Sequence, residues 1–261
     1  MDMRIGARNI ALIAIFSALQ LVISRLPGIP VYGVSGAKIE PQLILMPVMG
    51  IILGPWIGGL AAFIGNFIAW LIPSTTLFGM LMLPTVPIGT IVCGALSREG
   101  GKSDWKLASV ILTLLNILWY ISPPGLLVPY YPLLHLLALA FILLLRDKIQ
   151  SYIRSDVKRK FAIGATIASF SGMMANHMTG NLIYIASVNY FVQLRGVKDA
   201  LVKLGFSWLT SGLPKIDPTG LGAIFTILFP VSVIERIALT IISALICIGV
   251  TYTLKRSGFR F

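Results

Sequence analysis

Apolar stretches of roughly the length that crosses a bilayer recur along almost the whole chain, from residue 9 to residue 255. A helix needs about 20 consecutive apolar residues to cross the hydrocarbon core of a membrane. Hydrophobic residues fill 57% of the 261 positions and charged residues only 11%, whereas about a quarter of the residues of a soluble domain are charged. The sequence therefore predicts an all-α, polytopic integral membrane helical bundle, with residues 1–261 forming a single transmembrane domain.

The apolar runs predict about eight spans. The run 42–72 is divided at Gly54-Pro55, because proline cannot donate the helical hydrogen bond and disfavours helix at the residue before it. The run 161–191 is kept as one tilted span, although its glycines leave a division into two helices open. The predicted spans are 9–24, 42–53, 56–72, 78–96, 106–121, 126–145, 161–191 and 221–254.

Basic residues predict the orientation of these spans. With eight spans, fourteen of the 21 Lys and Arg residues fall on the side of the termini and six on the other side. Because Lys and Arg concentrate in cytoplasmic loops, we expect a multi-pass protein of the cell membrane with both termini in the cytoplasm. A division of the seventh span would move the basic residues of loop 193–220 inside. The net charge of +12 is spread over short loops, so the expected surroundings are a lipid bilayer and no nucleic acid.

Two long loops, 25–41 and 193–220, are expected on the outer side, where they act either as binding lids or as plain connectors. Lys38 and Glu40 in the first loop are weak binding candidates. In the second loop, the segment VKDALVKLGFSWL alternates apolar and charged residues at a helical spacing, which favours a helix lying along the outer surface.

Polar side chains within the seventh span give the most binding-like pattern in the sequence. His177, Asn181 and Tyr184 are four and three residues apart on one helical face, with Asn176 beside them. Polar groups at membrane depth are costly, so they usually face a ligand, a partner or the interior of the bundle. Hydrogen bonds that only hold the helices together are an equally good interpretation of each residue.

Three further residues are candidates for contact with a substrate. Arg236 could bind a carboxylate or phosphate, or it could form a structural ion pair with a neighbouring helix. Asn66 and Trp70 lie one helical turn apart, although Trp70 fits an interfacial anchor equally well. His135 has no polar neighbour in sequence and is expected to be a core histidine. The full set of expected substrate-binding residues is Asn66, Trp70, Asn176, His177, Asn181, Tyr184 and Arg236.

Small residues four apart in the first span, Ala14 and Ala18, would let another helix approach closely. This alanine pair, the basic start and the segments IEPQLILMPVMGIILGPWIGGLAAFIGN and FPVSVIERIALTIISALICIGVTYTLKR together resemble a substrate-binding S component of an energy-coupling factor (ECF) transporter. The resemblance covers roughly residues 9–96 and 161–256. It implies that Ala14 and Ala18 contact the transmembrane coupling subunit.

S components usually have six spans, so residues 106–145 are expected to be a hairpin inserted into the six-helix core, which comprises about 9–96 and 161–254. The resemblance implies a substrate-capture subunit of an ATP-driven importer for a vitamin or its precursor. Its partners would be a small-molecule substrate, the coupling subunit and ATPase subunits. ATP would be used by these partners, and no cofactor is expected on this chain.

Other function classes are poorly supported by the sequence. Motifs for hydrolysis, metal binding or nucleotide binding are absent from it, and with only two histidines and two cysteines neither an enzyme nor a metal site is expected. The same scarcity of titratable groups disfavours a proton-coupled carrier. A self-sufficient ion-coupled secondary transporter of a small solute stays the alternative, because backbone carbonyls can bind sodium.

Overall fold

A computed structural model of the chain describes residues 6–30, 38–39, 41–72, 76–98, 104–206 and 216–258. Within these ranges the regular structure is helical, apart from an antiparallel pairing of β1 (Ile29–Pro30) with β2 (Lys38–Ile39) and an isolated bridge between Val188 and Val192. Glu40 and much of both long outer loops lie outside the described residues. The predicted all-α class is confirmed, and the long apolar helices are compatible with a membrane bundle.

The helices follow the apolar runs of the sequence, because a backbone in hydrocarbon must satisfy its own hydrogen bonds. Short helices connect several of the long ones. Their bounds are α1 (Ala7–Ile23), η1 (Pro41–Leu45), α2 (Met46–Leu71), α3 (Leu77–Leu81), α4 (Thr85–Ser97), α5 (Trp105–Ile121), α6 (Pro123–Leu127), α7 (Leu133–Arg154), α8 (Lys158–Ser187), α9 (Leu194–Lys203) and α11 (Leu221–Arg256).

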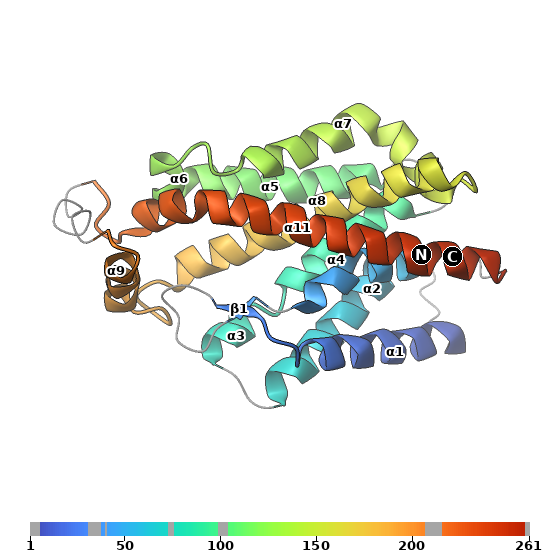
Figure 1. The fold of residues 1–261 in the computed structure, drawn as a ribbon, viewed down its shortest axis with the longest axis horizontal. Helices are drawn as coiled ribbons and strands as arrows, with labels where there is room; N and C mark the ends of the chain where they lie inside the picture. The colour runs from blue at the N-terminus through green and yellow to red at the C-terminus, as the bar shows by residue number, and fades with distance from the viewer. Residues whose placement is uncertain are drawn as a thin grey trace.

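The long helices run along one common direction, and both ends of the chain lie at the same end of the bundle (Figure 1). Helix α8 passes through the middle, packed against α4, α7 and α11. Helix α1 packs on α2 at one side, where Ser17 Oγ donates a hydrogen bond to Ala61 O (2.9 Å). The segment that leads from α5 to α7 belongs to the same bundle, because both helices pack against α8.

The predicted break at Gly54-Pro55 is confirmed as a kink inside α2. Gly54 has φ 75° and ψ 178°, a combination that is nearly restricted to glycine, and Pro55 follows it directly. The two halves of α2 form a tight hairpin against α4. A side chain is excluded at this contact: a Cβ added to Gly94 would lie 2.6 Å from the carbonyl carbon of Gly54, and one on Gly50 would lie 2.6 Å from Thr90 O.

Three other spans can be compared with the prediction. The run 161–191 is a single helix, α8, as expected, although it ends at Ser187. The predicted span 78–96 is divided into α3 and α4, and Pro84 is the residue before α4. The predicted span 126–145 starts too early, while its end agrees with the apolar part of α7, Leu133–Arg146. Residues 123–127 form the separate short helix α6, and α7 runs from Leu133 to Arg154.

Three helical segments among the described residues are long and apolar enough to cross a membrane, namely Pro41–Leu71, Leu77–Ser97 and Leu221–Arg256. Shorter apolar helices cover Ala7–Ile23, Trp105–Ile121 and Leu133–Arg146. The chain is therefore built from membrane-compatible helices, while the count of eight spans stays a prediction.

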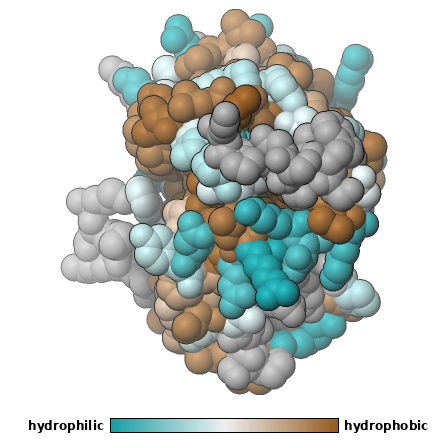
Figure 2. All heavy atoms as spheres, turned by 90° about the vertical axis from the view of Figure 1, so that its left-hand side faces the viewer, coloured by the Kyte–Doolittle hydropathy of each residue, from teal (hydrophilic) through white to brown (hydrophobic). Residues whose placement is uncertain are grey.

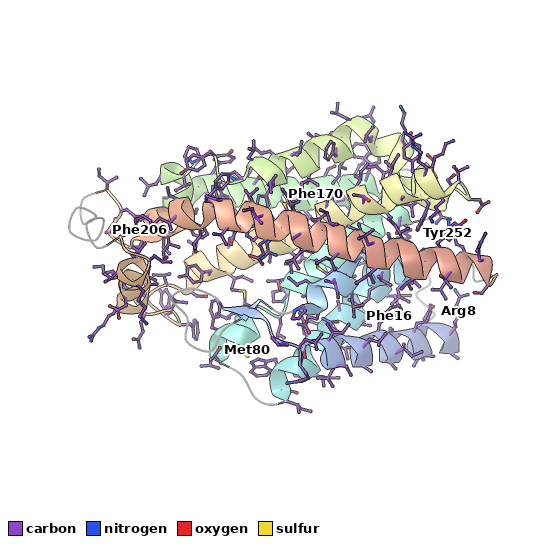
Figure 3. The ribbon with its side chains drawn as sticks, viewed as in Figure 1. Arg8, Phe16, Met80, Phe170, Phe206 and Tyr252 are labelled. Atoms are coloured by element: carbon purple, nitrogen blue, oxygen red, sulfur yellow. The ribbon has the colours of Figure 1, made fainter. Side chains whose placement is uncertain are left out.

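The two ends of the bundle differ in their polar groups. Arg8 and Tyr252 lie at the end that holds both chain ends, and Met80 and Phe206 lie toward the other end (Figure 3). At the first end Lys255 Nζ donates to Ile153 O (3.0 Å) and an Arg154 amine donates to Ser97 O (3.2 Å). These cations bind carbonyls at the C-terminal ends of α7 and α4, where the helix dipole favours positive charge.

The opposite end carries the amphipathic helix α9, which packs against α11 with Val197, Ala200 and Leu201 buried. Arg195 and Lys198 are exposed there. Figure 2 looks onto this end and shows hydrophilic residues gathered near its centre with apolar surface around them. The helix predicted for the segment 197–209 is confirmed for residues 197–203 and not for residues 204–206, while residues 207–209 lie outside the described ranges. Its place on the outer side of the membrane stays a prediction.

Candidate substrate site

A small cavity lies between α7, α8 and α11, with polar groups contributed by all three helices or by residues next to them. Its free space is about that of one water molecule. A solute larger than one water molecule could enter only if these helices separated. The lining residues are Tyr131, Leu134, His135, His177, Phe229, Ser232, Val233 and Arg236.

His177 is the centre of a hydrogen-bond network in this cavity. Its Nε2 lies 3.1 Å from Ser232 Oγ, 3.3 Å from Asn181 Nδ2 and 3.4 Å from Tyr131 Oη. Asn181 Nδ2 also donates to Tyr131 Oη (3.4 Å). The predicted pairing of His177 with Asn181 on one helical face is thus confirmed, and the network ties α8 to the start of α7 and to α11.

Arg236 lies at the same cavity and is almost completely buried, with 3% of its side chain exposed. One terminal amine donates to Glu235 Oε1 at 2.8 Å, and the other lies 3.9 Å from Met173 Sδ. Glu235 is 15% exposed and therefore lies nearer the edge of the bundle. The expected ion pair of Arg236 is present, but its partner is the preceding residue of α11 and not a group on a neighbouring helix.

Aromatic rings form one wall of the cavity. Tyr131 stacks on the fully buried Trp119 with ring centroids 4.6 Å apart, and it also contacts Phe229 at 5.9 Å. His135 is a core histidine, as expected, with 2% of the residue exposed. Its ring stacks on that of His177 with centroids 5.2 Å apart, because α7 and α8 lie side by side.

The other candidates of the seventh span lie next to this cavity but do not line it. Tyr184 is buried and packs edge-on against Phe78 and Phe225. Asn176 is 5% exposed and lies against α4: its Cβ would be 3.1 Å from a Cβ added to Gly89. The structure thus brings His177, Asn181 and Arg236 together and places Asn176 and Tyr184 at other helix contacts.

Asn66 belongs to a second polar cluster, which joins α1, η1, α2 and the turn before α4. Its Oδ1 accepts from Gln20 Nε2 (2.7 Å) and Gln42 Nε2 (2.8 Å), and its Nδ2 donates to Leu83 O (3.3 Å). All three amide side chains are at least nine-tenths buried. These contacts give Asn66 a role in holding four segments together.

An Asn66→Ala substitution tests this role. We expect the free energy of unfolding to fall by roughly 2–4 kcal/mol, because two buried glutamine amides lose their acceptor. Reversible unfolding in mixed micelles measures the change. Asn116→Ala is the matched control, since Asn116 is equally buried but donates to Leu112 O within its own helix. A loss no larger than that of the control would contradict the role of Asn66.

Trp70 lies away from the cavity. Its Nε1 donates to Thr76 O (3.1 Å), and its ring contacts Phe67 at 6.0 Å. The side chain is half-buried at the end of α2, and its role as an anchor at the membrane surface stays a prediction. For Lys38, the described backbone places the residue in β2, next to the outer loop.

Sequence reasoning missed Tyr131, Ser232 and Phe229. Tyr131 precedes α7, within the segment that was expected to be an insertion. His135, four residues later, lines the same cavity and is the sequence signal that could have pointed to Tyr131. Ser232 lies four residues before Arg236, so a helical-face comparison with Arg236 could have identified it. Phe229 is one of many apolar residues of α11.

Ala14 and Ala18 lie on the exposed face of α1, while Phe16, Ser17 and Gln20 of the same helix are buried. The exposed face is apolar and also includes Ile10 and Ile15. The small residues therefore leave a shallow strip on the outside of the bundle, where another helix can approach.

Fold and site together define a helical membrane protein with a buried polar cavity. The model of the family described as ECF-type riboflavin transporter, S component, matches residues 4–153, which is more than half of the chain. The chain belongs to this family of S components. The family is one of membrane transport proteins and not of enzymes.

A relative in Methanocaldococcus jannaschii, the uncharacterized protein MJ0923, is 36% identical over 152 residues. The aligned region covers 58% of this chain and 50% of the relative, so the chain spans about half the length of the curated relative it matches. No solved structure matches the chain.

The family match differs in extent from the resemblance seen in the sequence. It runs through residues 106–145 and ends at residue 153, before α8 begins. Helices α8 and α11, which carry His177, Asn181 and Arg236, therefore lie outside the matched region. Whether residues 106–145 are an insertion stays a prediction.

Proposed function

We propose that the chain is the membrane-embedded substrate-capture subunit of an ATP-driven importer for a small micronutrient. The observation that supports this most is membership in the S-component family. The polar cavity between α7, α8 and α11 supplies a place for the solute, with His177, Asn181 and Arg236 as binding residues. The other candidates would hold the helices around the cavity in position without touching the solute; they are Asn66, Trp70, Asn176 and Tyr184.

In this proposal the chain holds no cofactor, and its partners supply the energy. A transmembrane coupling subunit docks on the Ala14 and Ala18 strip of α1, and two ATPases bound to that subunit use ATP. Both termini lie in the cytoplasm, which agrees with the basic residues at the end of the bundle that holds them. The family description names riboflavin, which is therefore the first solute to test.

Transport by the purified chain alone tests this function. Vesicles that contain only this protein are expected to accumulate no labelled riboflavin, with or without a sodium or proton gradient, because the chain offers no energy source. Affinity purification from the native cell is expected to bring down ATPase subunits, and mass spectrometry of retained small molecules identifies the solute. Uphill accumulation by the chain alone would instead establish an ion-coupled carrier.

A further inference from the structure

The cavity contains buried hydrogen-bond donors that have no acceptor among the described residues. Arg236 Nε is one of them. His177 Nδ1 also has no partner among the described residues, and it is a second donor in the tautomer in which Nε2 accepts from Asn181 Nδ2. An unpaired buried donor costs about 1–3 kcal/mol. A ligand group that accepts hydrogen bonds from these donors recovers this free energy.

Arg236 also has a counter-ion, Glu235, that a bound anion could replace. Glu235 is five times more exposed than Arg236, at 15% against 3%, and the two are held by one hydrogen bond between them. A guanidinium forms its strongest pairs with two parallel bonds to one oxyanion, which this single contact does not provide. An incoming carboxylate or phosphate would keep the buried charge neutralised while Glu235 turns outward.

The remaining walls suit a flat apolar body. Tyr131 and Phe229 are 5.9 Å apart at the cavity, with Leu134 and Val233 beside them. The space for such a body must come from movement of a helix, and α11 is the least enclosed of the long apolar segments. In the most apolar part of α11, 28% of the residues are buried inside the bundle. The corresponding share is 67% for Pro41–Leu71 and 50% for Leu77–Ser97.

Resting on the proposed capture role, we propose that the solute bound between α7, α8 and α11 is a ring compound that carries an oxyanion. Arg236 binds the oxyanion in competition with Glu235, His177 Nδ1 donates to the same group, and Tyr131 and Phe229 contact the ring. A water molecule in the cavity would accept hydrogen bonds, but it brings no charge to replace that of Glu235.

Three probes of similar size test the proposal on the full chain in lipid nanodiscs: benzoate, phenyl phosphate and neutral benzamide. Binding is measured as the concentration-dependent shift of Tm. We expect benzoate, phenyl phosphate or both to raise Tm at concentrations where benzamide has no effect. The comparison of the first two distinguishes a carboxylate from a phosphate as the preferred oxyanion.

Variants locate the effect at Arg236. Glu235→Gln removes the competitor and is expected to lower the apparent Kd for the anionic probe about tenfold, since a hydrogen bond to a charged group is worth about 1.5–3 kcal/mol. The double variant Glu235→Gln with Arg236→Gln keeps the shape of the pair without its charges and is expected to lose the preference for anions.

An equal response to benzamide, no response to either anion, or a preference for anions that survives in the double variant would overturn the oxyanion proposal. The capture role is measured separately, by association with ATPases. If ATPases bind the chain while the anionic probes do not, the oxyanion proposal fails and the proposed function stands.

Discussion

An Ala14→Trp variant is expected to lose its association with the coupling subunit and the ATPases while it keeps its ability to bind solute. Ala14 is exposed on α1, one helical turn from Ala18, so a large side chain there fills the strip on which a partner helix would pack. The cavity residues lie on α7, α8 and α11 or just before α7, and they have no part in this surface. Co-purification of ATPase subunits from membranes measures the association.

The control for this variant is Leu114→Trp. Leu114 is 55% exposed on α5, so the substitution adds the same ring to another apolar surface of the bundle. It is expected to leave the amount of co-purified ATPase unchanged. If Ala14→Trp and Leu114→Trp retain ATPase equally well, the strip on α1 is not the docking surface.

A Gly94→Val variant is expected to destabilise the bundle strongly. The added Cβ would meet the backbone of Gly54, and backbone atoms cannot swing aside as the end of a side chain can. The hairpin of α2 must then move away from α4, which loosens the largest helix contact around the kink. We expect a loss of roughly 3 kcal/mol or more in the free energy of unfolding.

Gly249→Val provides the matched control, because nothing lies within 4 Å of a Cβ added to Gly249 in α11. Both substitutions place the same β-branched residue in an apolar helix, so helix propensity cancels in the comparison. Unfolding of both variants in mixed micelles, followed by loss of helical signal, gives the difference. Equal stability of the two variants would show that the contact of Gly94 with Gly54 is not limiting.

Local features of the sequence predicted the helices well. The kink at Gly54-Pro55 was predictable because proline and glycine act on the backbone of their own and adjacent residues. The span 126–145 was misplaced for a related reason: Pro123, Pro124 and Pro132 divide the segment into α6 and α7, while hydropathy alone continues across it. Helix spacing likewise predicted that His177 and Asn181 share a face.

The candidate site could be predicted only in part. Asn66 and Arg236 were both identified as buried polar residues of the spans, yet they belong to two different clusters. The difference depends on which helices are neighbours. Such contacts join residues far apart in sequence, as with Gln20 and Asn66 or Tyr131 and Ser232, and no local pattern encodes them.

The sequence by itself determined that the helices suit a lipid environment, where most of them lie, and that the small residues of α1 share one face. Hydropathy, proline and helical spacing act over a few residues, so a local pattern is enough to predict these features. The tertiary structure decided that His135 stacks on His177, that Tyr131 and Ser232 complete their site, and that Arg236 pairs with Glu235 next to a cavity the size of one water molecule. These outcomes depend on close packing between helices, where the fit of whole surfaces selects the neighbours.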